Sequence, residues 1–240
     1  MTDANASSDA DRDRDTGLDG EDPQAAADRI VEALLFDAGF DGWTDATLTR
    51  ATEAAGLPAS TQLAVFPGGI RDAIAHFSAW ADDQMLATLE SMGDGFHDAR
   101  VRDRITLAVK ARFEVLAPSK EAMKRLATTF ALPTYSPLAA RLCAQTADAM
   151  WRAAGDQSTD FNYYSKRGLL VAVLGSTSLY WLSDQSEDHE ATWGFLDRRI
   201  ANVLSVGGRL GKLSKGLGPA LEMPFRIAAG IRQRIVRDRG

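Results

Sequence analysis

The side chains that catalysis or metal binding would use are few and scattered in this sequence. The three histidines, His76, His97 and His189, lie far apart along the chain, and none has the spacing of a ligand pair or a catalytic group. The acidic residues around the last of them, in segment 187–190, follow Ser186, and acidic side chains in the first turn of a helix are favoured by its dipole. No catalytic residue and no metal ligand is predicted.

The one cysteine, Cys143, cannot by itself form a disulfide within the chain or a structural zinc site. Apolar Leu142 and Ala144 flank it in a helical pattern, which favours a buried, inert thiol over a reactive one. The sequence contains no GxSxG motif, phosphate-binding loop or dinucleotide fingerprint. We therefore expect a protein without cofactor or enzymatic activity, although a catalytic site assembled from distant residues stays open.

Large apolar side chains crowd the segment from 150 to 164. Gly155 ends one expected helix, and Ser158 or Thr159 can cap the next. The segment holds more large side chains than one inward face can bury, and an exposed aromatic cluster usually contacts a partner. The alternative is that all of them pack in the core. The residues assigned to this partner surface are Met150, Trp151, Asp160, Tyr163 and Tyr164.

Two stretches without charged residues could line a cavity. The run between Arg167 and Asp184 is 16 residues long, shorter than the ~20 that span a bilayer, and it is apolar on all sides, which indicates a central helix. The run between Arg125 and Arg141 carries two prolines that would splay the helix geometry. A lipid slot and an ordinary core fit these residues equally well. The expected lining residues are Phe130, Leu132, Tyr135, Leu138, Leu170, Val171, Leu174, Gly175 and Ser178.

Charge is distributed unevenly along the chain, whose net charge is −6. Residues 1–28 hold nine acidic and two basic side chains, whereas residues 207–240 hold eight basic and two acidic ones. Glycines from 207 to 218 predict a flexible linker, and the apolar stripe beyond it, with arginines on another side, predicts an amphipathic helix at a membrane surface. A solvated tail or a helix docked on a partner are the alternatives. The expected membrane contacts are Leu217, Leu221, Phe225, Arg226, Ile231, Arg234 and Ile235.

The elements that must position these residues are helices. From residue 25 onward apolar side chains recur every three or four residues, and no segment alternates with period two over a useful length. The sequence thus predicts an all-α protein of about ten helices. Its expected parts are a disordered acidic tail, 1–23, a helix-turn-helix-like unit, 24–68, a helical lipid-binding bundle, 69–206, and the linker with its amphipathic helix, 207–240.

Within the second part, Gly39 and Gly56 are expected to separate three short helices, with caps at Thr44 or Asp45 and at Ser60. This layout, with Gly39-Phe40, Ala55-Gly56-Leu57 and Phe66 before a long helix, resembles the TetR repressor family. A ligand-responsive transcriptional regulator is therefore the alternative function. However, the sequence has no Lys or Arg between Arg50 and Arg71, so the phosphate contacts that dominate DNA affinity are missing. No nucleic-acid partner is expected.

A second resemblance extends over about residues 25 to 237. Its motifs are Gly155-Asp156-Gln157-Ser158-Thr159-Asp160-Phe161-Asn162 with the following Tyr163, Tyr164 and Arg167, then Ser183-Asp184, and the run from Thr192 to Ile200. These motifs resemble the ninth Coq protein family, lipid-binding accessory factors of coenzyme Q (ubiquinone) biosynthesis. Tyr163 stands where the family often has tryptophan.

The resemblance implies a TetR-like homodimer that binds an isoprenoid, quinone or phospholipid ligand. It also implies that the protein presents this lipid at a membrane surface to the demethoxyubiquinone hydroxylase, with Met150, Tyr163 and Tyr164 in the surface that faces this partner. The acidic start of the sequence is the opposite of an arginine-rich transit sequence, and no apolar signal opens the chain. We therefore expect a cytoplasmic location, peripheral on the inner membrane.

Overall fold

The computed structural model describes residues 22–156 and 161–216, except the side chains of 161–163 and of 204–216. Contacts divide the chain into two compact units, Met1–Asp197 and Arg198–Gly240. All regular structure in the described residues is helical, which confirms the predicted all-α class. The amphipathic helix predicted beyond residue 216 and the acidic tail before residue 22 lie outside the described residues.

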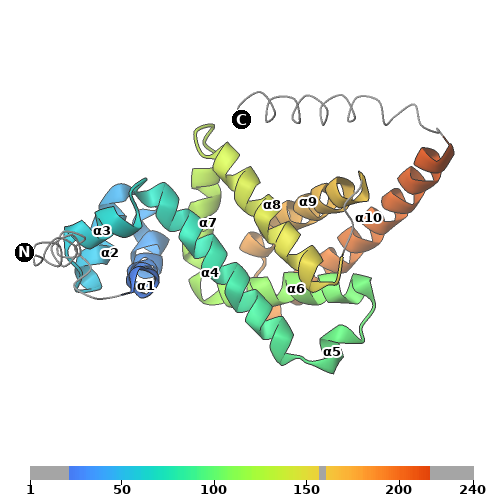
Figure 1. Ribbon diagram of the computed structural model, residues 1–240, viewed down its shortest axis with the longest axis horizontal. Coiled ribbons are helices and arrows are strands. Elements are labelled where there is room, and N and C mark those ends of the chain that lie inside the picture. The colour runs from blue at the N-terminus through green and yellow to red at the C-terminus, as the bar shows by residue number, and fades with distance from the viewer. Residues whose placement is uncertain (1–21, 157–160, 217–240) are drawn as a thin grey trace, which may run out of the picture. The chain divides into compact units, whose positions relative to one another are not determined.

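Three helices gather at the N-terminal end of the first unit (Figure 1). They are α1 (Pro23–Asp41), α2 (Asp45–Ala54) and α3 (Ala59–Val65). The predicted cap at Thr44 is confirmed: its hydroxyl accepts from the Thr47 backbone N–H, and the Thr47 hydroxyl accepts from the Thr44 backbone N–H in return. The three helices bury a shared core that includes Ile30, Leu34, Leu48 and Ala51.

Two of the expected helix boundaries are wrong. Gly39 does not end the first helix, which continues to Asp41 and ends at Gly42, where φ is +81°. A Cβ atom on Gly39 would lie 3.5 Å from the Cβ of Glu121, so the small residue serves close packing of α1 against α7 instead. Ser60 lies inside α3, and the residue before that helix is Pro58, which makes no side-chain cap.

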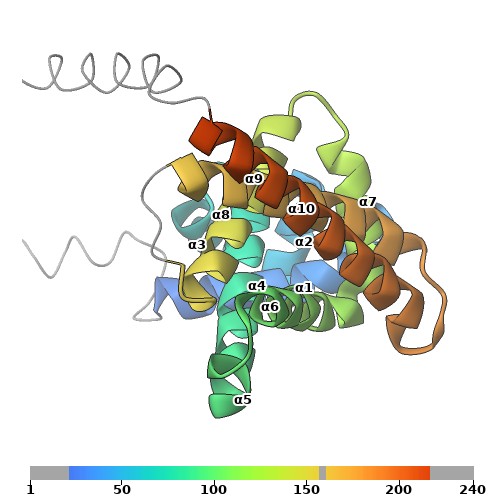
Figure 2. The same cartoon turned by 90° about the vertical axis from the view of Figure 1, so that its right-hand side faces the viewer.

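The long helix α4 (Ile70–Ser91) leads away from these three helices, and α6 (Val101–Leu116) lies beside it (Figure 2). Helices α7 (Lys120–Phe130), α8 (Ser136–Ala153) and α9 (Phe161–Ser183) complete the larger bundle. Apolar residues of α4 at helical spacing form the centre of its core: Ile74, Phe77, Ala81, Met85 and Leu89 are all buried.

Short elements connect and extend this bundle. The helix α5 (Asp94–His97) and the 3-10 turn η2 (Ala117–Ser119) flank α6, and η3 (Glu187–His189) precedes α10 (Glu190–Gly216). The linker predicted to begin at residue 207 is helical as far as Gly216, where α10 ends. Glycine lowers helix stability without preventing a helix, so the glycines at 207, 208 and 211 are tolerated within it.

Candidate functional site

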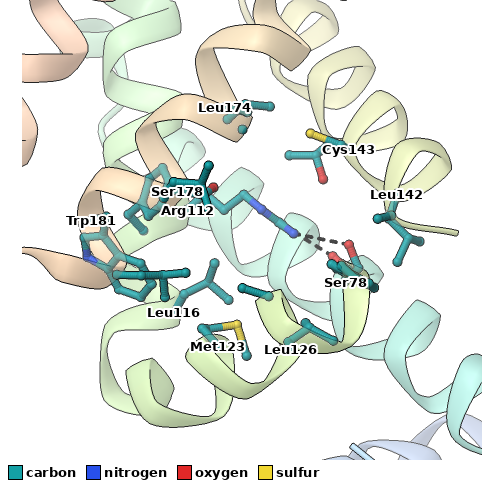
Figure 3. A pocket seen from close by; sticks show the side chains of 18 of the residues that line it. Ser78, Arg112, Leu116, Met123, Leu126, Leu142, Cys143, Leu174, Ser178 and Trp181 are labelled. Carbon is teal, nitrogen blue, oxygen red and sulfur yellow. Dashed lines mark hydrogen bonds between the residues drawn. The ribbon is translucent and has the colours of Figure 1, made fainter. Parts of the chain in front are cut away.

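A cavity of about 500 Å³ lies among α4, α6, α7, α8 and α9 (Figure 3). Its wall consists mostly of aliphatic and aromatic side chains, including Phe77, Phe113, Leu126, Leu142 and Trp181. A concave, largely apolar pocket of this size is typical of small-molecule sites. The helical bundle therefore encloses a preformed, largely apolar space of ligand size.

Small residues keep this space open. Ala139 on α8 and Gly175 and Ser178 on α9 contribute little volume to the wall. A Cβ atom built on Gly175 would meet no heavy atom within 4 Å, so nothing packs against this position. Helix α9 therefore does not fill the volume beside it. The expectation that this helix is central is wrong, because Ala172, Gly175 and Leu179 on it are exposed.

The cavity has an exposed mouth and a buried end. Ala131, Gly175 and Leu179 line it and are exposed, and Leu179 exposes 68% of its surface. At the other extreme, Ser78 and Thr146 line it and are only 9% and 3% exposed. A ligand can therefore enter over α9 and the end of α7 and reach polar groups inside.

Arg112 forms the centre of those polar groups. Its guanidinium extends from α6 toward Ser78 of α4 (Figure 3). Nη1 donates to the Asp82 carboxylate and, at 3.4 Å, to the Ser78 carbonyl, while Nη2 donates to the Ser78 hydroxyl at 3.2 Å. The Thr146 hydroxyl donates to the other Asp82 oxygen at 3.0 Å. The cavity wall thus contains a hydrogen-bonded ion pair that joins α4, α6 and α8.

Burial dominates the electrostatics of this pair. It raises the pKa of the Asp82 carboxyl, although the Arg112 charge and the Thr146 hydrogen bond act in the opposite direction. Burial also lowers the pKa of the Arg112 guanidinium, against the stabilising charge of Asp82. The pKa of the Cys143 thiol is raised by burial as well, which agrees with an inert rather than a reactive thiol.

The structure brings together four of the nine residues expected to line a lipid slot: Phe130, Leu174, Gly175 and Ser178. The other five lie elsewhere. Leu138 and Leu170 are buried outside the cavity wall, Val171 is half-buried outside it, Leu132 is 51% exposed, and the Tyr135 ring packs under the Arg71 guanidinium at 4.2 Å. Sequence reasoning missed the walls supplied by α4 and α6, because only helix packing brings them to the two uncharged stretches.

The residues of the expected partner surface differ in their exposure in the structure. Met150 is completely buried, so it cannot form part of an exposed surface. Trp151 is half-buried, and its Nε1 donates to the Lys166 carbonyl at 3.1 Å. Tyr164 is 70% exposed. Asp160 and the Tyr163 side chain lie outside the described residues.

Below this surface, an ion-pair cluster joins the end of α8 to the start of α9. Arg167 is 9% exposed and pairs with Asp148 and with Asp156, the latter at 3.1 Å. Lys166 pairs with Asp156 at 2.7 Å, and Arg152 pairs with Asp148. These ion pairs thus connect the end of α8 and the turn at Asp156 to α9, the helix that carries Tyr164.

The Asp184 motif has a structural role. The Asp184 carboxylate accepts hydrogen bonds from the backbone N–H of Ser186 at 2.8 Å and of Thr192 at 2.9 Å, and from both hydroxyls. Burial raises the pKa of this carboxyl, but the hydrogen bonds from Thr192 and Ser186 outweigh it and bring the pKa well below its usual range. These contacts fix the turn between α9 and α10.

Helix α3 carries no basic side chain. Thr61 is buried, and Gln62 accepts from the Thr52 hydroxyl, so the outer face presents Ser60, Leu63 and Ala64. Nearby, the Arg50 guanidinium pairs with Asp37 and Asp41. DNA affinity depends on basic side chains that reach phosphates. The outer face of α3 presents small and apolar side chains with one hydroxyl, and no cation.

Neither a metal site nor a membrane-spanning helix is found in the described residues. Over residues 22–156 and 161–216, no group of His, Cys, Asp and Glu side chains could hold a metal ion. In the same part of the chain, no helix has the length and apolar character needed to cross a bilayer. The seven expected membrane contacts, from Leu217 to Ile235, lie outside the described residues.

Fold and cavity together define an all-α protein with a helix-turn-helix-like N-terminal unit and a ligand-sized apolar pocket. The fold is similar to that of a solved structure titled as the TetR transcriptional regulator from Nitrosomonas europaea. The two folds agree with a TM-score of 0.60 over 76% of this chain and 99% of that one, at 19% sequence identity. The predicted TetR-like fold is therefore confirmed, and the likeness concerns the fold alone.

The chain belongs to the COQ9 family. The family model named COQ9 matches residues 136–207, which include α9 and the turn at Asp184. The chain is 31% identical over 216 residues to the human protein named "Ubiquinone biosynthesis protein COQ9, mitochondrial", covering 88% of this chain and 67% of that protein. The rat protein of the same name is 32% identical, with 88% and 69% covered, and the Drosophila melanogaster protein is 28% identical, with 89% and 67% covered. This membership supports a role in ubiquinone biosynthesis.

The relatives also correct one expectation. The sequence predicted a cytoplasmic location, peripheral on the inner membrane, because no transit sequence was recognised. That prediction is contradicted, since the human, rat, Drosophila and Dictyostelium discoideum relatives are all named as mitochondrial proteins. The acidic start of the sequence was not a valid guide to location.

Proposed function

We propose that this chain is a non-catalytic lipid-binding protein of ubiquinone biosynthesis. It holds an isoprenoid or quinone intermediate in the cavity among α4 and α6–α9 and presents it at a membrane to the demethoxyubiquinone hydroxylase. The observation that carries the proposal is the cavity itself: about 500 Å³, apolar walls, an exposed mouth at Leu179 and polar groups at the buried end.

The energetics favour a long apolar ligand. Each CH₂ group transferred from water to such a site contributes about 0.8 kcal/mol, so a chain of roughly ten carbons would gain on the order of 8 kcal/mol. That is equivalent to a micromolar dissociation constant before the costs of ordering the ligand. The wall needs no catalytic group for this role.

Presentation to the enzyme would use the surface around Tyr164. This side chain is exposed on α9, and the Arg167 cluster beneath it fixes the helix start. Exposed aromatic side chains above a rigid base are common anchors of protein interfaces. The basic segment beyond residue 216 would supply the membrane contact, and a homodimer is the assembly that the family resemblance implies.

Extraction of the purified full-length chain with organic solvent, followed by mass spectrometry, tests lipid binding. We expect stoichiometric isoprenoid or quinone species that are absent from an extract of an unrelated protein purified in parallel. An extract without any apolar compound, from a protein that also takes up no added quinone, contradicts the proposal. An electrophoretic shift with specific DNA at low salt would instead favour a TetR-type regulator, which the surface of α3 does not support.

A further inference from the structure

The two charged groups at the polar end of the cavity have opposite signs. Arg112 is cationic, but its Nη1 contacts the Asp82 carboxylate, so guanidinium and carboxylate together carry no net charge. The Arg112 side chain lines the cavity, whereas Asp82 lies behind it and does not form part of the wall. A ligand head group would therefore meet the N–H edge of a guanidinium whose charge is already compensated.

The Arg112 guanidinium has more N–H donors than the neighbouring side chains and carbonyls accept from. A guanidinium carries five N–H donors. Two donate from Nη1, to Asp82 and to the Ser78 carbonyl, and one donates from Nη2 to the Ser78 hydroxyl. Among the described residues, no acceptor pairs with the Arg112 Nε or with the second Nη2 hydrogen. The Ser178 side chain also lines the cavity (Figure 3).

We propose that the Asp82–Arg112 pair makes the cavity selective for neutral amphiphiles whose head group accepts a hydrogen bond, such as a carbonyl or ether oxygen. Carboxylates and phosphates are disfavoured there. An anion brought to this buried end would lose its hydration and face Asp82 behind the guanidinium, so the attraction to Arg112 would be offset by repulsion. A neutral acceptor pays a smaller desolvation cost and still gains a charge-assisted hydrogen bond. The inference rests on the proposed lipid-binding function and specifies its ligand.

Two probes with the same chain separate the head groups: methyl laurate, a neutral ester, and laurate, its carboxylate. Equilibrium binding of each radiolabelled probe to the delipidated full-length chain at pH 8 gives a preference ratio. For the unchanged protein we expect the ester to bind at least about tenfold more tightly than laurate, because the laurate carboxylate would be a buried charge without a net opposite charge beside it. Equal binding, or tighter binding of laurate, would overturn the proposal.

Asp82→Asn supplies the decisive comparison, because it retains the shape of the side chain and leaves the Arg112 charge uncompensated. We expect the preference to fall or reverse in favour of laurate by roughly tenfold or more. An unchanged ratio in a folded variant contradicts the role of the pair. Circular dichroism verifies that the variant is folded.

The double variant Asp82→Leu with Arg112→Met keeps the test valid if the single variant fails to fold, because apolar replacement of a whole buried ion pair is usually tolerated. Here we expect ester affinity to fall about tenfold through loss of the donor. Unchanged ester affinity would refute the proposal. If neither probe binds even the unchanged protein, lipid binding itself fails. If both bind equally, lipid binding stands and only the selectivity is wrong.

Discussion

The Arg167 guanidinium donates from Nη1 to the Asp156 carboxylate at 3.1 Å, which connects α9 to the turn three residues beyond the end of α8. The same guanidinium pairs with Asp148 through Nε. Both aspartates and the arginine are largely buried, so the cluster is shielded from solvent screening. It determines how the two helices meet beneath Tyr164.

Replacing Arg167 with Met should lower the free energy of unfolding by about 3 kcal/mol, because it leaves two buried carboxylates without their shared cation. Urea denaturation measures this change. Arg152→Ala is the matched control: Arg152 also pairs with Asp148, but its side chain is 73% exposed, so the expected cost is under about 1 kcal/mol. Equal losses in the two variants would show that burial does not set the strength of this cluster.

Gly175→Leu should block the cavity. The position lines the mouth, and a Cβ atom added there meets no heavy atom within 4 Å, so we expect a leucine to occupy the space that a lipid needs. We expect at least a tenfold loss of bound lipid in the organic extract, with thermal stability unchanged or higher because leucine favours a helix over glycine. Gly168→Leu, on the same helix and equally free of nearby atoms but outside the cavity wall, is the control. Full lipid content in the Gly175 variant would exclude this route.

The stability of the protein in acid should depend on Asp184. The folded carboxyl has a pKa below its usual value, so the unfolded state binds a proton more readily. The contribution of Asp184 is therefore present above the ordinary aspartate pKa of about 3.9 and is lost as pH falls toward the lower folded value. Asp184→Asn should flatten the fall of unfolding free energy below about pH 4. Thr192→Val, which removes one donor, should flatten it partly, and an unaltered slope in both variants would argue against this carboxylate.

Tyr164→Ser should weaken binding to the demethoxyubiquinone hydroxylase by roughly tenfold, the loss expected for an aromatic anchor at an interface. Surface plasmon resonance with the immobilised enzyme measures it. Phe36→Ser provides a control, because Phe36 is 75% exposed but lies on α1, away from the junction of α8 and α9. If the two variants bind the enzyme equally well, the partner surface is elsewhere.

Removing residues 217–240 should reduce cosedimentation with anionic liposomes. This segment contains five arginines and the apolar residues of the expected amphipathic stripe. Each basic residue near an anionic surface contributes about 1 kcal/mol, and high salt should weaken the attachment of the full chain. A chain that ends at Gly216 and still sediments to the same extent would disprove the role of this segment.

Several features of the protein follow from local sequence alone. The spacing of Ile74, Phe77 and Ala81 predicts a helix because side chains three or four residues apart share one face. The cap at Thr44 depends on neighbouring residues in the same way. The resemblance carried by the motifs around Asp156 and Asp184 led to the family that the relatives then showed.

Other features depend on residues that are far apart in the chain. The local sequence predicts that a helix ends at Gly39. The structure shows instead that the glycine allows α1 to pack closely against Glu121 of α7, and no local pattern reveals that contact. Leu132 and Tyr135 share the apolar character of Phe130 but lie outside the cavity, because they belong to the turn between α7 and α8, beyond the helix end that carries Phe130.

The buried end of the cavity shows the difference most clearly. Ser78, Asp82 and Arg112 belong to helices that the sequence identifies only as amphipathic, and their pairing requires α4 and α6 to lie side by side. Sequence alone determined that the protein is helical. Tertiary packing decided that the space beside α9 is a cavity with a charge-compensated polar end, because long-range contacts set the positions of its walls.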